Sequence, residues 1–210
     1  MNANVRKYIM VFTVVGLGVC FMLLGSSMAY FSNKTEVVIN NFTVGEISID
    51  VIEDDFDKEE AKTVEPGQVI NKNPSIKNVG KNDAYVFIEV SIPRKSIKVV
   101  NDDETVNPKE IVDLFTYDMN ADWIELSRES DDNTTIIAYA YLLPPLNVGQ
   151  TTTTLFDKVK FVNFLEGSLD KNETYILDVK GYAVQYDGVD TSAYDTDFDK
   201  YTYIYKTFLN

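Results

Sequence analysis

Two small residues near the N-terminus have the spacing at which a signal peptidase cuts. Ser27 and Ala29 follow an apolar run of about sixteen residues, and Arg6 and Lys7 precede that run. This order of basic, apolar and small residues is typical of a secretory signal peptide, and the run is short for a bilayer span. We therefore expect cleavage after Ala29, a signal peptide over residues 1–29 and a mature chain that begins at Tyr30.

An uncleaved N-terminal anchor is the alternative, because the apolar run approaches the length of a short span. A lipoprotein signal is not expected, since Val19 precedes Cys20 where a small residue is needed. The sequence thus predicts a secreted protein, with membrane contact only through the uncleaved signal peptide.

Histidine is absent from the chain, and its single cysteine, Cys20, leaves with the signal peptide. A Ser-His-Asp triad, a Cys-His pair and an HExxH zinc helix each need an imidazole, and thiol catalysis needs a cysteine. The commonest extracellular hydrolase mechanisms therefore have no residues to carry them. We predict no enzyme activity, no cofactor and no metal ligands, and a fold that rests on core packing without disulfides.

Alternating carboxylates near the C-terminus imitate the start of a calcium-binding loop. Asp195, Asp197 and Asp199 have the spacing of the first ligands of an EF-hand. However, Lys200 stands where glycine is needed, and Lys206 where a bidentate glutamate is needed. We interpret this stretch as a polar surface segment.

Loss of the signal peptide makes the chain more acidic. It removes Arg6 and Lys7 and no carboxylate, so 17 Lys and Arg remain against 33 Asp and Glu and the formal net charge falls from −14 to −16. Such a charge repels the phosphates of nucleic acids and anionic lipids. We therefore expect no nucleic-acid partner. The length of residues 30–210 suits one domain around a single core.

Short strands separated by turns are predicted for the mature chain. Tyrosine, phenylalanine and β-branched residues dominate, in runs broken by Asn, Asp, Gly and Pro. We predict an all-β, jelly-roll-like antiparallel β-sandwich over residues 45–210, preceded by a strand-prone segment, residues 30–44. The expected strands are 76–79, 85–92, 123–126, 136–142, 155–161 and 175–186, and Pro93 is expected to end the second of them.

Turn and loop signals separate these strands. Val64-Glu65-Pro66-Gly67-Gln68 places proline and glycine in the positions of a type II turn. The acidic run 53–62 is interpreted as a solvated loop. Gly45 marks a change of alternation between residues 42–44 and residues 47–51, as a tight turn or a bulge requires.

One short helix is predicted as an excursion between strands. Asn107 can cap it, Pro108 suits its first position, and Ile111, Leu114 and Phe115 fall on one stripe. The conformation of the C-terminal tail stays open, because its tyrosines alternate as in a strand while its aromatic residues also follow a helical spacing.

Several motifs occur together in the order and spacing of a known family. They are Ala29-Tyr30-Phe31-Ser32, Phe42-Thr-Val-Gly45-Glu-Ile47-Ser-Ile49, Val64-Glu-Pro66-Gly67-Gln68, Ile76-Lys-Asn78-Val-Gly80, Leu146-Asn-Val-Gly149-Gln-Thr151, Leu155-Phe156-Asp-Lys-Val159 and Tyr182-Ala183-Val-Gln185. In these motifs the chain resembles the TasA/camelysin family of secreted bacterial proteins, whose signal peptides a SipW-type signal peptidase removes. The resemblance covers nearly the whole mature chain.

The resemblance implies a structural subunit that is exported to form fibres in a biofilm matrix or on the cell surface. Its expected partners are further copies of the chain, the signal peptidase and other matrix proteins. Camelysins are described as surface metallopeptidases, so a peptidase is one alternative, although the chain lacks histidine and a recognisable zinc-binding pattern. A monomeric surface adhesin is the other.

Residues 30–44 supply a physical route to assembly. Once freed by cleavage, this segment can add to the open sheet edge of a second copy and gain backbone hydrogen bonds along its length. Val37, Ile39 and Phe42 are the apolar side chains that such a strand would bury. Because donor and acceptor surfaces differ, the contact is head to tail and builds a filament instead of a closed dimer. Pairing of the segment within its own domain is the competing arrangement.

Overall fold

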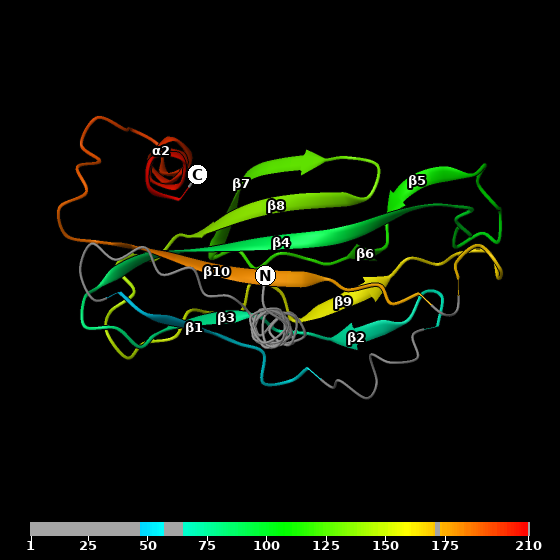
Figure 1. Cartoon of the computed structure of the whole chain (residues 1–210), viewed down its shortest axis with the longest axis horizontal. Coiled ribbons are helices and arrows are strands. Elements are labelled where there is room, and N and C mark those ends of the chain that lie inside the picture. Colours follow the sequence, from blue (N-terminus) through cyan, green and yellow to red (C-terminus); the bar gives the residue numbers. More distant parts are fainter. Residues whose placement is uncertain (1–46, 57–64, 171–172, 210) are drawn as a thin grey trace, which may run out of the picture. The chain divides into compact units, whose positions relative to one another are not determined.

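The computed structural model describes residues 47–56, 65–170 and 173–209. In these ranges the chain forms antiparallel strands and one helix (Figure 1). The elements are β1 Ile49–Ile52, β2 Val69–Asn71, β3 Ser75–Asn78, β4 Ala84–Ile97, β5 Glu110–Asp113, β6 Phe115–Thr116, β7 Trp123–Ser130, β8 Thr134–Tyr141, β9 Lys158–Phe161, β10 Asp178–Gln185 and α2 Asp197–Phe208. The predicted all-β fold is confirmed. The predicted signal peptide and the segment 30–44 lie outside the described residues.

The larger sheet is built around β4. Its strands lie in the order β10-β4-β8-β7, and β5 pairs with the far end of β4. At 14 residues, β4 is long enough for two partners on one side, with β10 along its first part and β5 along residues 94–97. The strands predicted over 123–126, 136–142 and 175–186 are confirmed as β7, β8 and β10.

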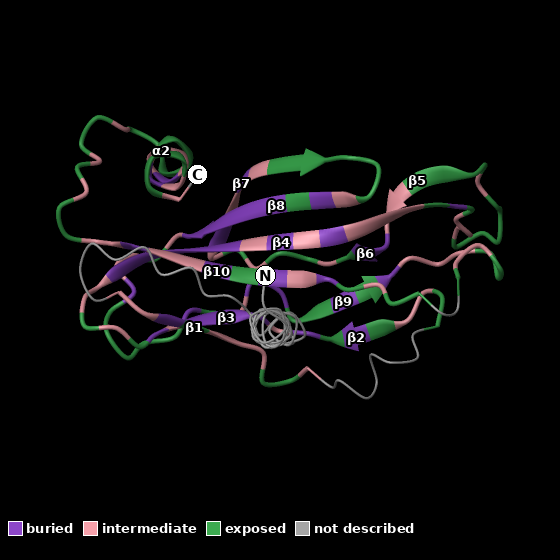
Figure 2. Ribbon diagram, viewed as in Figure 1, coloured by how far each residue is buried: buried purple, intermediate pink, exposed green. Residues whose placement is uncertain are grey.

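Shorter strands form the second layer of the sandwich. β1 pairs with β3, and β9 lies between β2 and β6. The stretch 146–157 connects these two groups, because Asn78 N–H donates to Gln150 O at 2.9 Å and Leu155 N–H donates to Pro74 O at 2.8 Å. Figure 2 shows buried segments in strands of both layers, and their side chains form one main hydrophobic core.

Side chains on both faces of β4 are buried. Val86, Ile88, Val90 and Ile92 alternate along the strand, and the face that they form lies in the main core. On the opposite face, Phe87 packs in a second cluster together with residues of α2. The larger sheet is therefore covered on both faces where the helix lies.

Pro93 does not end the strand, contrary to the prediction, and β4 continues to Ile97. Leu114 N–H donates to the Pro93 carbonyl at 2.9 Å. The Leu114 carbonyl, which an N–H at position 93 would otherwise reach, accepts from Val162 N–H at 2.9 Å. The missing donor of proline therefore leaves no acceptor unpaired, and the strand can pass through this position.

The helix predicted from Asn107 to Phe115 is wrong, because the chain forms β5 and β6 there. β5 pairs with residues 94–97 of β4, so its backbone groups bond to a neighbouring strand and not within a helical turn. The apolar stripe is divided as well. Leu114 and Phe115 are buried in the main core, whereas Ile111 is 39% exposed. Tertiary pairing overrides the local helix signals.

The C-terminal tail forms α2, in agreement with the helical spacing. Asp199 N–H donates to Thr196 Oγ1 at 3.1 Å, and the Thr196 hydroxyl donates to the Asp199 carboxylate at 2.7 Å. Tyr201 and Ile204 are fully buried in the same cluster as Phe87. Asp199 thus belongs to a helix cap and not to a calcium-binding loop.

The predicted type II turn after the acidic run is confirmed. Gly67 has a φ of +76°, and Gln68 N–H donates to Glu65 O at 3.1 Å. The turn predicted around Gly45 lies outside the described residues.

Candidate assembly surface

The sequence-predicted site residues all lie outside the described residues. They are Ser27, Ala29 and Tyr30 at the cleavage site and Val37, Ile39 and Phe42 in the polymerisation strand. Their roles stay predictions. The structure does describe edges of the sheets, and such an edge is where a donated strand would bind.

β1 is an outer strand of the second layer. Val79 N–H donates to Ser48 O at 3.0 Å, so Ser48 and every second residue after it direct their backbone groups toward β3. The N–H and C=O groups of Ile49 and Val51 consequently point to the other side of β1. Within the described ranges, no strand pairs with β1 on that side.

Close contact with β10 fixes the position of β1. Gly181 of β10 is buried, and a Cβ atom placed on it would lie 2.7 Å from Val51 Cγ2 and 3.2 Å from Ile49 Cδ1. A larger residue would push β1 outward, because real Cβ atoms do not approach other atoms this closely. Glycine therefore allows β1 to lie directly over the edge strand of the larger sheet.

An ion pair holds the chain that leaves β1. Lys72 Nζ lies 2.7 Å from Glu53 Oε1 and 4.5 Å from the centre of the Phe56 ring, and the Lys72 side chain is only 8% exposed. Asp55 N–H donates to Asn73 Oδ1 at 3.0 Å, and Asn73 Nδ2 donates back to Asp55 at 2.9 Å. Asp54 and Asp55 are exposed, as predicted for this acidic run, while Glu53 and Asp55 anchor its start to the fold.

β2 has a second open edge in the same layer. Lys72 N–H donates to Asp157 O at 3.1 Å, and this register directs the backbone groups of Val69 and Asn71 away from β9. Val69 is 51% exposed. No described strand lies on this side of β2.

β7, one of the two outer strands of the larger sheet, is built differently. A β-bulge interrupts its register between Glu125 and Ser127. Arg128 donates to the Glu125 carboxylate through Nε at 3.0 Å and through Nη2 at 2.9 Å. Bulges and charged side chains are common devices that prevent an edge strand from pairing with another chain. The described edges thus differ, because β7 carries a bulge and the paired Glu125 and Arg128, whereas β1 and β2 pair in regular register.

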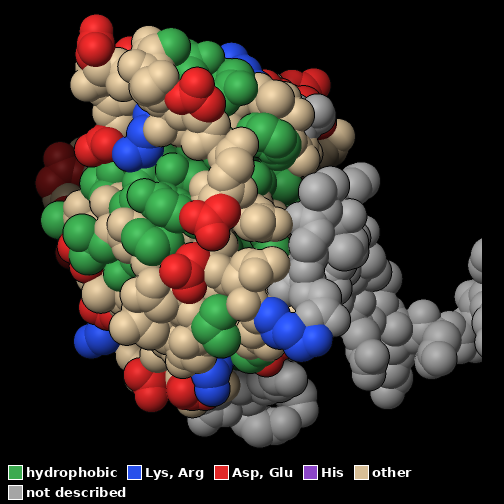
Figure 3. All heavy atoms as spheres, turned by 90° about the vertical axis from the view of Figure 1, so that its left-hand side faces the viewer, with side chains coloured by type: hydrophobic (Ala, Val, Ile, Leu, Met, Phe, Trp, Pro, Cys, Tyr) green, Lys and Arg blue, Asp and Glu red, His purple; other side chains and the backbone are tan. Residues whose placement is uncertain are grey.

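The surface combines acidic and apolar side chains. Figure 3 shows the end of the molecule that carries α2, where hydrophobic side chains gather between scattered acidic ones. In the described part of the chain, no group of three or more His, Cys, Asp or Glu side chains is placed to hold a metal ion. The described helix is too short and too polar to cross a bilayer.

The fold and these edges define an all-β sandwich protein. No protein-family model matches the chain, and comparisons with curated proteins and with solved structures find no match either. The resemblance to the TasA/camelysin family therefore rests on the sequence motifs.

Proposed function

We propose that this chain is a secreted structural subunit of an extracellular biofilm matrix fibre. In this proposal the signal peptidase frees residues 30–44, and the segment adds as a strand to the next copy. Copies then join head to tail, since the donated strand and the receiving edge are different surfaces.

The side of β1 on which no described strand lies is the observation that carries the proposal. A strand added there would bond to the N–H and C=O groups of Ile49 and Val51. The side chains of both residues belong to the main core or pack against it, so the new strand would extend a layer that is already fixed by Gly181 and by the Glu53–Lys72 pair. The bulge and the Glu125–Arg128 pair make addition of a strand to the β7 edge less favourable.

Apolar burial supplies the driving force. Val37, Ile39 and Phe42 would be exposed on a free tail, and full burial of each is worth roughly 1.5–3 kcal/mol. Val37 and Ile39 lie two residues apart, so a donated strand would present both to the same face of the receiving domain. No specific observation favours the peptidase or the adhesin.

Electron microscopy of two matched variants tests the proposal. Ile39→Asp should abolish fibres, because a buried unpaired carboxylate costs several kcal/mol. Asn40→Asp adds the same charge at a position whose side chain faces the other way, and it should retain fibres. Fibres from Ile39→Asp that match the wild type in number and length would contradict strand donation.

A further inference from the structure

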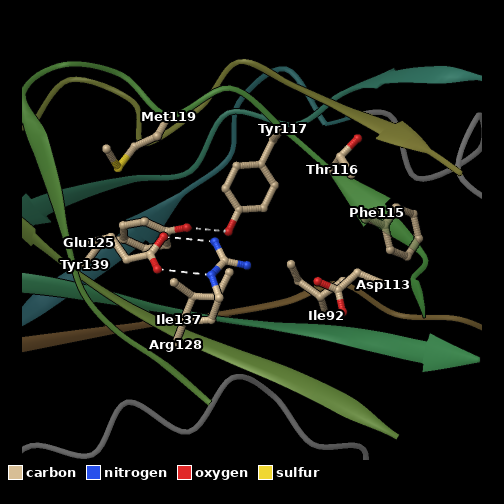
Figure 4. A pocket seen from close by; sticks show the side chains of 10 residues that line it. All are labelled: Ile92, Asp113, Phe115, Thr116, Tyr117, Met119, Glu125, Arg128, Ile137 and Tyr139. Atoms are coloured by element: carbon tan, nitrogen blue, oxygen red, sulfur yellow. Dashed lines mark hydrogen bonds and ion pairs between the residues drawn. The ribbon is translucent and has the colours of Figure 1, made fainter. Parts of the chain in front are cut away.

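A small pocket opens where β7 faces the chain around β6. Its volume is about 250 Å³, and its lining comes from both layers of the sandwich. Figure 4 shows the Arg128 guanidinium between Glu125 and Asp113, with the Tyr117 hydroxyl turned toward Tyr139 and apolar side chains around these polar groups. Polar and apolar groups thus converge in a space smaller than the roughly 300–1,000 Å³ of pockets for drug-sized ligands.

The bulge in β7 creates the polar wall. Residues three apart in a regular strand point to opposite faces. Here Glu125 lies opposite Tyr139 and Arg128 lies opposite Ile137, two residues of β8 that share a face. The extra residue of the bulge therefore turns both charged side chains into the pocket, where they form their two-fold hydrogen bond.

Hydrogen-bonding groups remain unused around this pair. Arg128 bonds Glu125 through Nε and Nη2, and Figure 4 shows Nη1 on the side turned away from Glu125. The hydroxyls of Tyr117 and Tyr139 lie 2.9 Å apart. Burial raises the pKa of both tyrosines, so both stay protonated at neutral pH. One hydroxyl hydrogen bridges the pair, and the other can be donated to a ligand.

The charges of the pocket are compensated. Asp113 Oδ1 lies 3.0 Å from Arg94 Nε and accepts from the Thr135 hydroxyl at 2.6 Å. An anionic ligand would meet the carboxylates of Glu125 and Asp113, and a cationic ligand would meet Arg128. The pocket therefore suits a neutral ligand whose groups both donate and accept hydrogen bonds.

We propose that this pocket binds a single neutral sugar residue. Sugar hydroxyls donate to carboxylates and accept from guanidinium and phenol groups, which matches the mixture of groups present here. The C–H face of the ring would lie against the apolar lining, Ile92 and Phe115 among it. This site is separate from β1, so sugar binding and fibre formation can each be present without the other.

Saturation-transfer NMR of the purified protein with the methyl glycosides of glucose, galactose and N-acetylglucosamine tests the proposal. At least one glycoside should give a saturable signal. Glu125→Gln combined with Arg128→Gln should weaken it at least about tenfold, since hydrogen bonds to charged groups are lost. The matched control is Lys95→Gln combined with Glu173→Gln, which removes an exposed ion pair elsewhere and should leave the signal unchanged.

Three results would overturn the proposal. The first is the absence of a saturable signal from every glycoside. In that case Glu125 and Arg128 would serve only to protect the edge of β7. The second is equal binding by the pocket variant and the wild type. The third is displacement of the glycoside by acetate, which would make the site an anion site. If the double variant fails to fold, the Tyr117→Phe variant replaces it in the same measurement. This variant removes one hydroxyl of the pocket and keeps the ring, so it should also weaken the glycoside signal.

Discussion

At the scale of single residues, Gly181 determines how closely the two layers approach at β1. A Cβ atom at this position would lie 2.7 Å from Val51 Cγ2, which neither strand can accommodate without a shift. Gly181→Ala should therefore destabilise the domain by about 1–3 kcal/mol, the usual cost of overpacking a core. Thermal unfolding followed by circular dichroism measures the effect.

Lys180→Ala is the control for this substitution. It lies next to Gly181 in β10, but its side chain is 46% exposed and its ion pairs with Glu89 and Asp178 are long, at 3.9 and 3.7 Å. Its effect should stay within about 0.5 kcal/mol. Equal unfolding temperatures for Gly181→Ala and the wild type would show that β1 has room to move.

The spacing of two residues explains why the sequence could not predict the polar pocket. Glu125 and Arg128 are three apart, a spacing that puts side chains on opposite faces of a regular strand. Only the bulge after Glu125 brings them together, and no glycine or proline marks it in the sequence. The ion pair between Lys72 and Glu53 could not be predicted either. Glu53 is the first residue of an acidic run, and its local sequence does not distinguish it from the solvated carboxylates that follow.

At the scale of elements, alternation predicted the strands well, and local capping signals were misleading. The strands expected over 85–92 and 175–186 form as β4 and β10, and alternating apolar residues of both lie in the main core. The stretch 107–115 has the signals of a helix start, yet β4 offers it an open edge at residues 94–97 and strand pairing prevails. A prediction from local sequence cannot include that edge, since it lies in a different part of the chain.

The packing of α2 should be sensitive to alkaline pH. Burial raises the pKa of Tyr201 and Tyr205, and Tyr205 also donates to Glu89 at 3.3 Å. In the unfolded chain a tyrosine loses its proton near pH 10, whereas both stay protonated in the fold. Their contribution to stability is thus complete below about pH 10 and is lost as the pH rises further.

Urea unfolding at a series of pH values between about 8 and 12 measures this loss. The midpoint should fall above about pH 10, and it should fall less in the Tyr201→Phe variant, which has no proton to lose there. A midpoint that stays constant over the whole series would contradict the buried arrangement of these phenols.

At the scale of the whole molecule, negative charge opposes the proposed assembly. Each mature copy carries a formal charge of −16 when residues 1–29 are removed, so neighbouring copies in a fibre repel each other. Raising the salt concentration from about 0.01 M to about 0.15 M shortens the Debye length from about 30 Å to about 8 Å.

Fibre growth should therefore accelerate over this range of salt. Light scattering of the protein that begins at Tyr30 measures the growth rate, and an equal osmolarity of sucrose is the control. Slower growth at the higher salt concentration would indicate that ion pairs between copies, and not apolar strand addition, hold the fibre together.

Deletion of residues 30–39 tests strand donation most directly. The shortened protein should elute as a single monomeric peak in size-exclusion chromatography, form no fibres under the electron microscope and keep the β-type circular dichroism of the full mature chain. Fibres from the shortened protein would show that assembly uses another surface. Loss of its β-type spectrum would show that the segment belongs to the sheet of its own domain, and either result would contradict strand donation.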